Sequence, residues 1–354
     1  MTSTDDKQYD LLIIGAGLAG SILACKLMLA GKRTLVVSDP SIPSASRAAA
    51  GLINPVTGQR MVLQENIEAL LASAETFYSD MEGKFGITLL HKRQMLRLFQ
   101  SEKEKKAWQK RLDDLAYGPY IDQQSAEETT IHAELGGFIQ YQTGNLDTNL
   151  LLDSLHAWFR QQNALIEAPF HHDQLTVESN LIRWQKIEAK RVIFCEGWRG
   201  QANPWFNWLP FQPAKGEILT LKSESEIPDK IINRGKWLLP VSNQSFKFGA
   251  TYERTELDEL PTDAAKDELL HAISGMFVET PKLHITDHVA GVRPGTKDKH
   301  PFLGFHPDHS TLGIFNGFGS KGSLFTPWYA ETFVSHITKG NTLPPQADIG
   351  RFHG

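Results

Sequence analysis

Residues 10–20 read Asp-Leu-Leu-Ile-Ile-Gly-Ala-Gly-Leu-Ala-Gly, so an apolar run leads directly into the pattern G-x-G-x-x-G. A helical pattern follows over residues 18–30, and a second apolar run, Thr-Leu-Val-Val, occupies residues 34–37. Strand, glycine turn, helix and strand in this order form the unit that holds the pyrophosphate of a dinucleotide. The sequence therefore predicts a dinucleotide-binding domain at its start.

The glycines and the end of the second strand define the expected contacts with the nucleotide. Gly15 permits the tight turn, Gly17 lets the backbone approach the phosphates, and Gly20 lets helix and strand pack closely. An acidic residue at the end of the second strand usually accepts hydrogen bonds from the adenosine ribose. Ser38 stands at that position and Asp39 one place later. Either residue could therefore contact the ribose.

Length and composition exclude several classes of protein. The 354 residues predict two lobes, and a net charge of −5 gives no electrostatic reason to expect nucleic-acid binding. Cys25 and Cys195 are the only cysteines, which predicts no disulfide framework and a cytoplasmic location. Glycines and Lys26 interrupt the apolar residues 11–30, so we expect no membrane span. We also expect no metal site, because no cluster with metal-ligand spacing stands out.

Eight blocks along the chain together resemble FAD-dependent oxidoreductases of the D-amino acid oxidase and glycine oxidase class. The blocks are GAGLAG at 15–20, SRAAAGL at 46–52, TGNLD at 143–147, VIFCEGW at 192–198, KGEIL at 215–219, GATYE at 249–253, AGVRPGTKDKHPFLG at 290–304 and GFGSKGSLFTP at 317–327. The resemblance implies an α/β fold: a Rossmann-like FAD-binding domain (1–86, 144–210 and 284–354) and a second, mixed-sheet α+β substrate domain (87–143 and 211–283).

The resemblance also implies which residues surround a non-covalently bound FAD. These residues are Gly15, Ala16, Gly17, Ala19, Gly20, Ser38, Asp39, Ser46, Arg47, Ala49, Ala50, Gly51, Phe170, Cys195, Gly197, Arg293, Gly319, Ser320, Lys321, Gly322 and Ser323. The block at 46–52 read alone also fits a helix capped by Ser46. Similarly, the strand that ends at Gly197 fits a core strand closed by a turn.

Three residues are the predicted catalytic group. Arg293 matches the arginine that grips a substrate carboxylate in the family, and a planar guanidinium suits a bidentate pair with a carboxylate. A helix starting near Gly322 would aim its N–H groups at the pyrimidine side of the flavin, where Lys321 would favour the reduced, anionic form. Tyr252 lies in the block where relatives present pocket residues. Arg293 in a structural ion pair and Lys321 exposed in a loop are the alternatives.

The resemblance implies oxidation of the C–N bond of an amino acid or N-substituted amino acid, with oxygen or another electron acceptor. The substrate is expected to be a small amine that carries a carboxylate, and nucleic acid is an unlikely partner. Two alternatives stay open. The block GFGSKG is closer to the oxidase half of the bifunctional enzyme that modifies the wobble uridine of tRNA, which removes a carboxymethyl group. The other alternative is a flavin-binding protein without turnover.

Overall fold

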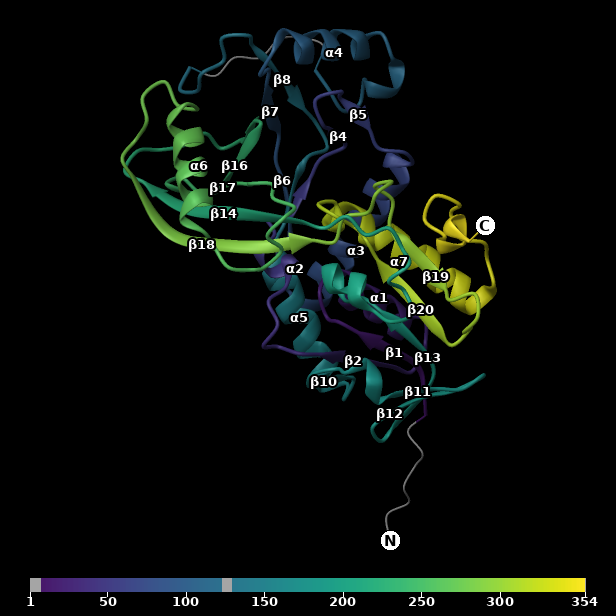
Figure 1. Cartoon of the computed structure of the whole chain (residues 1–354). Helices are drawn as coiled ribbons and strands as arrows, with labels where there is room; N and C mark the ends of the chain where they lie inside the picture. The colour runs from purple at the N-terminus through teal and green to yellow at the C-terminus, as the bar shows by residue number, and fades with distance from the viewer. Residues whose placement is uncertain (1–7, 123–128, 354) are drawn as a thin grey trace. The chain divides into compact units, whose positions relative to one another are not determined.

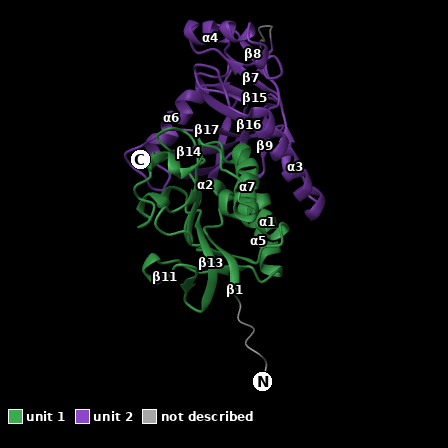
Figure 2. Cartoon of the chain, turned by 90° about the vertical axis from the view of Figure 1, so that its right-hand side faces the viewer, with its two compact units in different colours: residues 1–47, 148–214, 293–354 green, residues 48–147, 215–292 purple. Residues whose placement is uncertain are grey.

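The computed structural model describes residues 8–122 and 129–353, and the chain forms two compact units (Figure 2). Unit 1 comprises residues 1–47, 148–214 and 293–354, and unit 2 comprises residues 48–147 and 215–292. The predicted domain bounds differ from this division mainly at residues 48–86, which belong to unit 2. The reason is strand pairing, because β3 (Leu52–Ile53) pairs with β9 (Gly144–Leu146), which in turn pairs with β6 (Leu90–Lys92).

Unit 1 is built on an eight-stranded sheet (Figure 1). The strand order is β10-β2-β1-β13-β12-β11, while β20 pairs with β13 and β19 pairs with β20. The pairs β10–β2, β2–β1, β1–β13 and β13–β20 are parallel, and this is the arrangement that the opening motif predicts. The strands are β1 (Gln8–Ile14), β2 (Thr34–Ser38), β10 (Leu165–Glu167), β11 (Leu175–Val177), β12 (Ile182–Trp184), β13 (Ile187–Phe194), β19 (Phe302–Phe305) and β20 (Leu312–Asn316).

Helices cover the parallel part of this sheet. α1 (Leu18–Leu29) packs against α5 (Thr148–Gln161) and α7 (Gly322–Lys339). α1 is apolar around most of its circumference, and Ile22, Leu23 and Leu27 are fully buried, as expected for a helix enclosed by neighbours. The shorter helices are α2 (Ala45–Ala48), η2 (His172–Gln174), η3 (Gly197–Ala202) and η4 (Ile349–Phe352).

Unit 2 contains a mixed sheet in the order β18-β14-β17-β16-β15-β7-β8. The strands are β7 (Met95–Leu98), β8 (Gly137–Gln140), β14 (Ala214–Ser223), β15 (Ile231–Arg234), β16 (Lys236–Ser242), β17 (Ser245–Gly249) and β18 (Leu283–Arg293). Short strands β4 (Val56–Thr57) and β5 (Val62–Leu63) form a hairpin. The helices are α3 (Ile67–Phe85), α4 (Glu102–Leu112), η1 (Leu115–Tyr117) and α6 (Asp263–Ser274).

Together these units confirm the predicted fold class, an α/β unit of Rossmann type and a second unit with a mixed sheet. Each unit has its own apolar core. The core of unit 1 includes Trp184, Phe194 and Phe206, and that of unit 2 includes Phe246 and Phe248. Among the helices of residues 8–122 and 129–353, none is long and apolar enough to cross a membrane.

Candidate cofactor and substrate site

The turn between β1 and α1 leaves no room for side chains. Gly15 has φ +100°, and a Cβ on it would lie 2.4 Å from the carbonyl oxygen of Cys195. A Cβ on Gly20 would lie 1.9 Å from the carbonyl oxygen of Gly15. Gly17 is the N-cap of α1, and its Cβ would meet the hydroxyl of Ser46 at 3.1 Å. These glycines therefore keep the backbone of the turn bare, and this geometry fits a bound pyrophosphate.

Ser46 caps α1 across a long sequence distance. The backbone N–H of Leu18 donates to the Ser46 hydroxyl oxygen at 3.0 Å. The first N–H groups of a helix have no carbonyl partner within the helix, so this hydroxyl satisfies one of them. Ser46 thus lies beside the predicted phosphate site, although it caps α1 rather than its own short helix. Arg47 is directed elsewhere, because its guanidinium contacts Asp153 (2.6 Å) and Asn149 on α5.

The ribose position stays open between Ser38 and Asp39. The backbone oxygen of Ser38 accepts a hydrogen bond from Ala168, where β10 lies beside β2. The Asp39 carboxylate accepts hydrogen bonds from the backbone N–H (2.9 Å) and the hydroxyl (2.6 Å) of Ser41. These bonds from Ser41 lower the pKa of Asp39. The Asp39 carboxylate is therefore engaged in its own turn, and a ribose contact would have to share or replace those bonds.

A histidine–glutamate pair next to Gly197 is not predicted from the sequence. The His172 imidazole contacts the Glu196 carboxylate at 2.8 Å, and the Asn203 amide donates to its other oxygen at 2.8 Å. The hydrogen bond with Glu196 raises the pKa of His172 despite the opposing effect of burial. Phe170 packs edge-on against His172. Glutamate between Cys195 and Gly197, at the carboxyl end of a buried strand, is the sequence signal that could have indicated this pair.

The turn before α7 lies against the residues after β18 and beside the start of α1, where a Cβ on Gly322 would lie 3.6 Å from the Leu18 side chain. The N–H of Gly319 donates to the carbonyl oxygen of Pro294 at 3.0 Å. Pro294 directly follows Arg293 in the sequence, so the turn 317–322 contacts the residue after Arg293. Arg293 is the last residue of β18. The structure thus brings together the two blocks that hold the predicted carboxylate ligand and the predicted flavin-side turn.

Lys321 is the N-cap residue of α7 and is partly buried. Its ammonium lies 5.2 Å from the centre of the Phe325 ring. Burial lowers the pKa of Lys321 to about 8, and the nearby charge of Lys299 contributes to the shift. A lysine with this pKa carries its proton for most of the time at neutral pH and loses it in mildly alkaline solution. The alternative of a fully solvated loop lysine does not describe this environment.

The predicted residues Ala49, Ala50, Gly51 and Tyr252 lie in unit 2. Gly51 has φ +71°, and a Cβ on it would lie 2.0 Å from the carbonyl oxygen of Leu146, so the backbones of β3 and β9 approach closely there. Ala50 is buried in an apolar cluster with Ile218. Tyr252 is 61% exposed, and its hydroxyl accepts a hydrogen bond from Arg254 at 2.9 Å. The catalytic role of Tyr252 stays a prediction.

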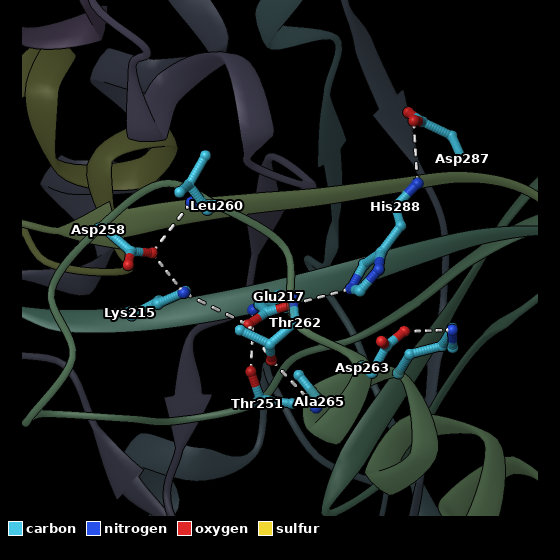
Figure 3. Close-up of polar contacts among 11 residues, drawn as sticks. Lys215, Glu217, Thr251, Asp258, Leu260, Thr262, Asp263, Ala265, Asp287 and His288 are labelled. Atoms are coloured by element: carbon cyan, nitrogen blue, oxygen red, sulfur yellow. Dashed lines mark hydrogen bonds and ion pairs between the residues drawn. The ribbon is translucent and has the colours of Figure 1, made fainter.

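The blocks 215–219 and 249–253 meet in a buried polar network in unit 2, where the N–H of Glu217 donates to the Thr251 hydroxyl at 2.9 Å (Figure 3). Glu217, almost fully buried, accepts hydrogen bonds from the N–H (2.8 Å) and hydroxyl (3.0 Å) of Thr262 and contacts the His288 imidazole at 2.9 Å. Lys215 lies 3.6 Å from Glu217 and 2.6 Å from Asp258. Each buried charge therefore has an opposite charge beside it. The network fixes the start of α6, since the Thr262 hydroxyl caps that helix.

Metal binding is not supported in the described ranges, where His, Cys, Asp and Glu form no group that could hold an ion. Cys25 and Cys195 are both buried and form no disulfide with each other. Burial raises the pKa of the Cys195 thiol, so it is a packing residue rather than a nucleophile.

Comparisons with known proteins agree with this geometry. Glycine oxidase of Pseudomonas aeruginosa is 25% identical over 90% of this chain and 91% of its own length. The tRNA 5-methylaminomethyl-2-thiouridine biosynthesis bifunctional protein of Acinetobacter baylyi is 25% identical over 97% of this chain, which spans only 55% of that protein. The crystal structure of glycine oxidase from Geobacillus kaustophilus superimposes with a TM-score of 0.82 at 18% identity, over 95% of this chain and 96% of that one. A family model described as FAD dependent oxidoreductase matches residues 10–335, so the chain belongs to the DAO family of FAD-dependent oxidoreductases, and FAD is its cofactor.

Proposed function

We propose that this protein oxidises the C–N bond of an amino acid or N-substituted amino acid. The observation that carries the proposal is the hydrogen bond of Gly319, in the turn before α7, with Pro294, the residue after Arg293, in a unit whose glycine turn fits a dinucleotide. The similarity to glycine oxidases supports the same class of substrate.

In the proposed reaction, Arg293 binds the substrate carboxylate and so orients the carbon next to the nitrogen. Bound FAD would supply the acceptor for the hydride that leaves this carbon. The nitrogen lone pair forms the imine as the C–H bond breaks, and water then hydrolyses the imine to a carbonyl compound and an amine. Lys321 and the N-terminus of α7 would stabilise the negative charge that reduction places near them. Oxygen or another acceptor would remove the electrons.

The predicted contacts of FAD belong to the same proposal. The first turn of α1 with Gly15, Gly17 and Gly20 would hold the pyrophosphate, and Gly197 would approach it from the end of β13. Residues 319–323 would lie at the flavin. Two buried cysteines that form no disulfide support a reducing compartment such as the cytoplasm.

An anaerobic substrate screen tests this function. Glycine, N-methylglycine and other amino acids are added to the FAD-loaded protein, and loss of the visible flavin absorbance reports reduction. At least one carboxylated amine should bleach the flavin. No bleaching by any of them would refute the proposal and would favour a flavin-binding protein without turnover.

The variant Arg293→Ala distinguishes a role of Arg293 in substrate binding from a structural role. We expect KM for a carboxylated substrate to rise by about 100-fold, as expected for a lost bidentate ion pair worth about 3 kcal/mol. FAD content should stay unchanged, and Arg293→Lys should recover part of the loss. Parallel loss of FAD and activity would instead make Arg293 a structural residue.

The second candidate is oxidative removal of a carboxymethyl group from a modified tRNA base, which is also a carboxylated secondary amine. The similarity to the Acinetobacter baylyi protein favours it, although this chain spans about half of that relative. A net charge of −5 argues against a general affinity for RNA. This candidate would be selected if the flavin is reduced by tRNA that still carries the carboxymethyl group and is not reduced by any free amino acid.

A further inference from the structure

A surface pocket of about 400 Å³ lies in unit 2, between α4 and the turn that joins β4 to β5. Its lining residues are Gln59, Arg60, Lys103, Ala107, Lys110 and Arg111. Four of these carry a positive charge, and no carboxylate is among them. The chain as a whole has a net charge of −5, so the pocket concentrates charge of the opposite sign.

The spacing of the helical residues explains how their charges converge. Lys103, Ala107, Lys110 and Arg111 are separated by four, three and one positions, so they share one face of α4. The small side chain of Ala107 leaves a hollow between the cations. Arg60 adds its charge from the turn opposite.

Buried contacts hold the two walls together. Arg97, only 6% exposed, donates to the carbonyl oxygen of Gly58 at 2.7 Å and lies 3.7 Å from Glu104, a buried residue of α4. Arg111 donates weakly to the carbonyl oxygen of Arg60 at 3.5 Å, and its guanidinium lies over the Tyr117 ring. The pocket is therefore a fixed feature of unit 2 rather than a chance gap between long side chains.

The cations in the pocket are available to a ligand. Within the part of the chain that the structure describes, no carboxylate forms an ion pair with Arg60, Lys103, Lys110 or Arg111. Arginine binds phosphate in a bidentate manner and lysine as a point charge. The lining has no aromatic residue on which a base could stack. This chemistry selects for charge rather than for a base.

We propose that this pocket binds a ligand with two or more linked phosphate groups, such as tripolyphosphate or the phosphate chain of a nucleotide. Its volume falls in the range of ligand pockets and exceeds what one phosphate fills. Four cations match the charge of a di- or triphosphate better than that of orthophosphate. The site is separate from the proposed oxidation and does not depend on it.

Isothermal titration calorimetry of the FAD-loaded protein with orthophosphate, tripolyphosphate and ATP tests the site. We expect saturable binding that strengthens with the number of phosphates. Equal affinity for tripolyphosphate and ATP would assign recognition to the phosphate chain alone, and a preference for ATP would identify a nucleotide as the source. Absence of saturable binding of either compound in low salt would overturn the proposal.

Matched double variants locate the binding. Lys103→Gln with Lys110→Gln should weaken tripolyphosphate binding by about tenfold, as expected for two exposed charges. Lys105→Gln with Lys222→Gln removes the same charge from residues outside the lining and should change binding by less than about twofold. Both variants should keep the flavin spectrum and the melting temperature, because glutamine is a good helix former at the α4 positions and Lys222 is exposed. If both double variants weaken tripolyphosphate binding equally, binding depends on the overall surface charge and the proposed site is refuted.

The same titration with an RNA oligonucleotide tests whether the pocket belongs to a nucleic-acid surface. Binding of RNA that is far tighter than that of tripolyphosphate, and that is lost in the Lys103→Gln/Lys110→Gln variant, would show a nucleic-acid surface and overturn the assignment to a small ligand.

Discussion

Replacing Glu196 by glutamine tests how much the histidine–glutamate pair stabilises unit 1. The glutamine side chain has the same size as that of Glu196 and can still accept the hydrogen bond from Asn203, which is fully buried. The substitution removes the negative charge that His172 contacts at 2.8 Å. The perturbation therefore removes one charge-assisted hydrogen bond and little packing.

The expected loss depends on pH. A hydrogen bond between charged groups contributes about 1.5–3 kcal/mol, and a neutral one about 0.5–1.5 kcal/mol. The folded-state pKa of His172 is raised by Glu196, so its contribution is fully present below the unfolded value of about 6.5 and is lost as the pH rises through the folded value. Glu196 stays ionised in the wild type at both pH values, so the variant should be less stable at both. The loss should be about 1 kcal/mol larger near pH 6, where His172 is charged, than near pH 9.

Urea denaturation of the FAD-loaded proteins, followed by tryptophan fluorescence at both pH values, measures these differences. Glu167→Gln is the control, because Glu167 forms an exposed pair with Arg160 (2.7 Å) in the same unit. It should cost at most about 1 kcal/mol at either pH, since arginine keeps its charge throughout. A loss in Glu196→Gln that is the same near pH 6 and near pH 9 would refute a charged His172.

Two further predictions concern packing and buried charge. Gly20→Ala places a methyl group 1.9 Å from the carbonyl oxygen of Gly15, so it should lower FAD content and reduce the free energy of unfolding by about 1–3 kcal/mol. The control Gly83→Ala, in an open helical position, should increase the free energy of unfolding by about 0.5–1 kcal/mol. Arg97→Met leaves the buried Glu104 carboxylate uncompensated and should cost about 3–5 kcal/mol in urea denaturation, while the double variant with Glu104→Met should recover part of this loss.

The parts of the fold that local sequence determines were predicted closely. The helix predicted over residues 18–30 is α1, Leu18–Leu29. It is apolar on nearly all sides, so the glycine turn rather than periodicity defines its start. The apolar spacing of residues 148–162 indicates an amphipathic helix, and α5 spans Thr148–Gln161. The charged residues 101–115 predict a surface helix with Trp108 directed inward, and Trp108 on α4 is only 6% exposed.

Features that depend on distant partners were not predicted. The apolar pattern of residues 67–85 indicates a helix but cannot show that β3, before it, pairs with β9 about 90 residues later, and this pairing places residues 48–86 in unit 2. Glu104 belongs to a strongly charged segment that predicts a solvated helix, yet it is buried because Arg97 on β7 lies beside it. Neither partner can be inferred from spacing along the chain.

The predicted pyrophosphate contacts and the predicted substrate contacts also differ in how much the sequence alone indicates. A pyrophosphate is recognised through backbone N–H groups, which require residues without side chains, so Gly15, Gly17 and Gly20 mark that end in the sequence itself. A substrate is recognised through side chains, and Arg293 suits any carboxylate equally well. What distinguishes one amine from another must come from the groups that surround the rest of the molecule. Glycine oxidation and removal of a carboxymethyl group share the carboxylate and the amine, so only a direct comparison of substrates can separate them.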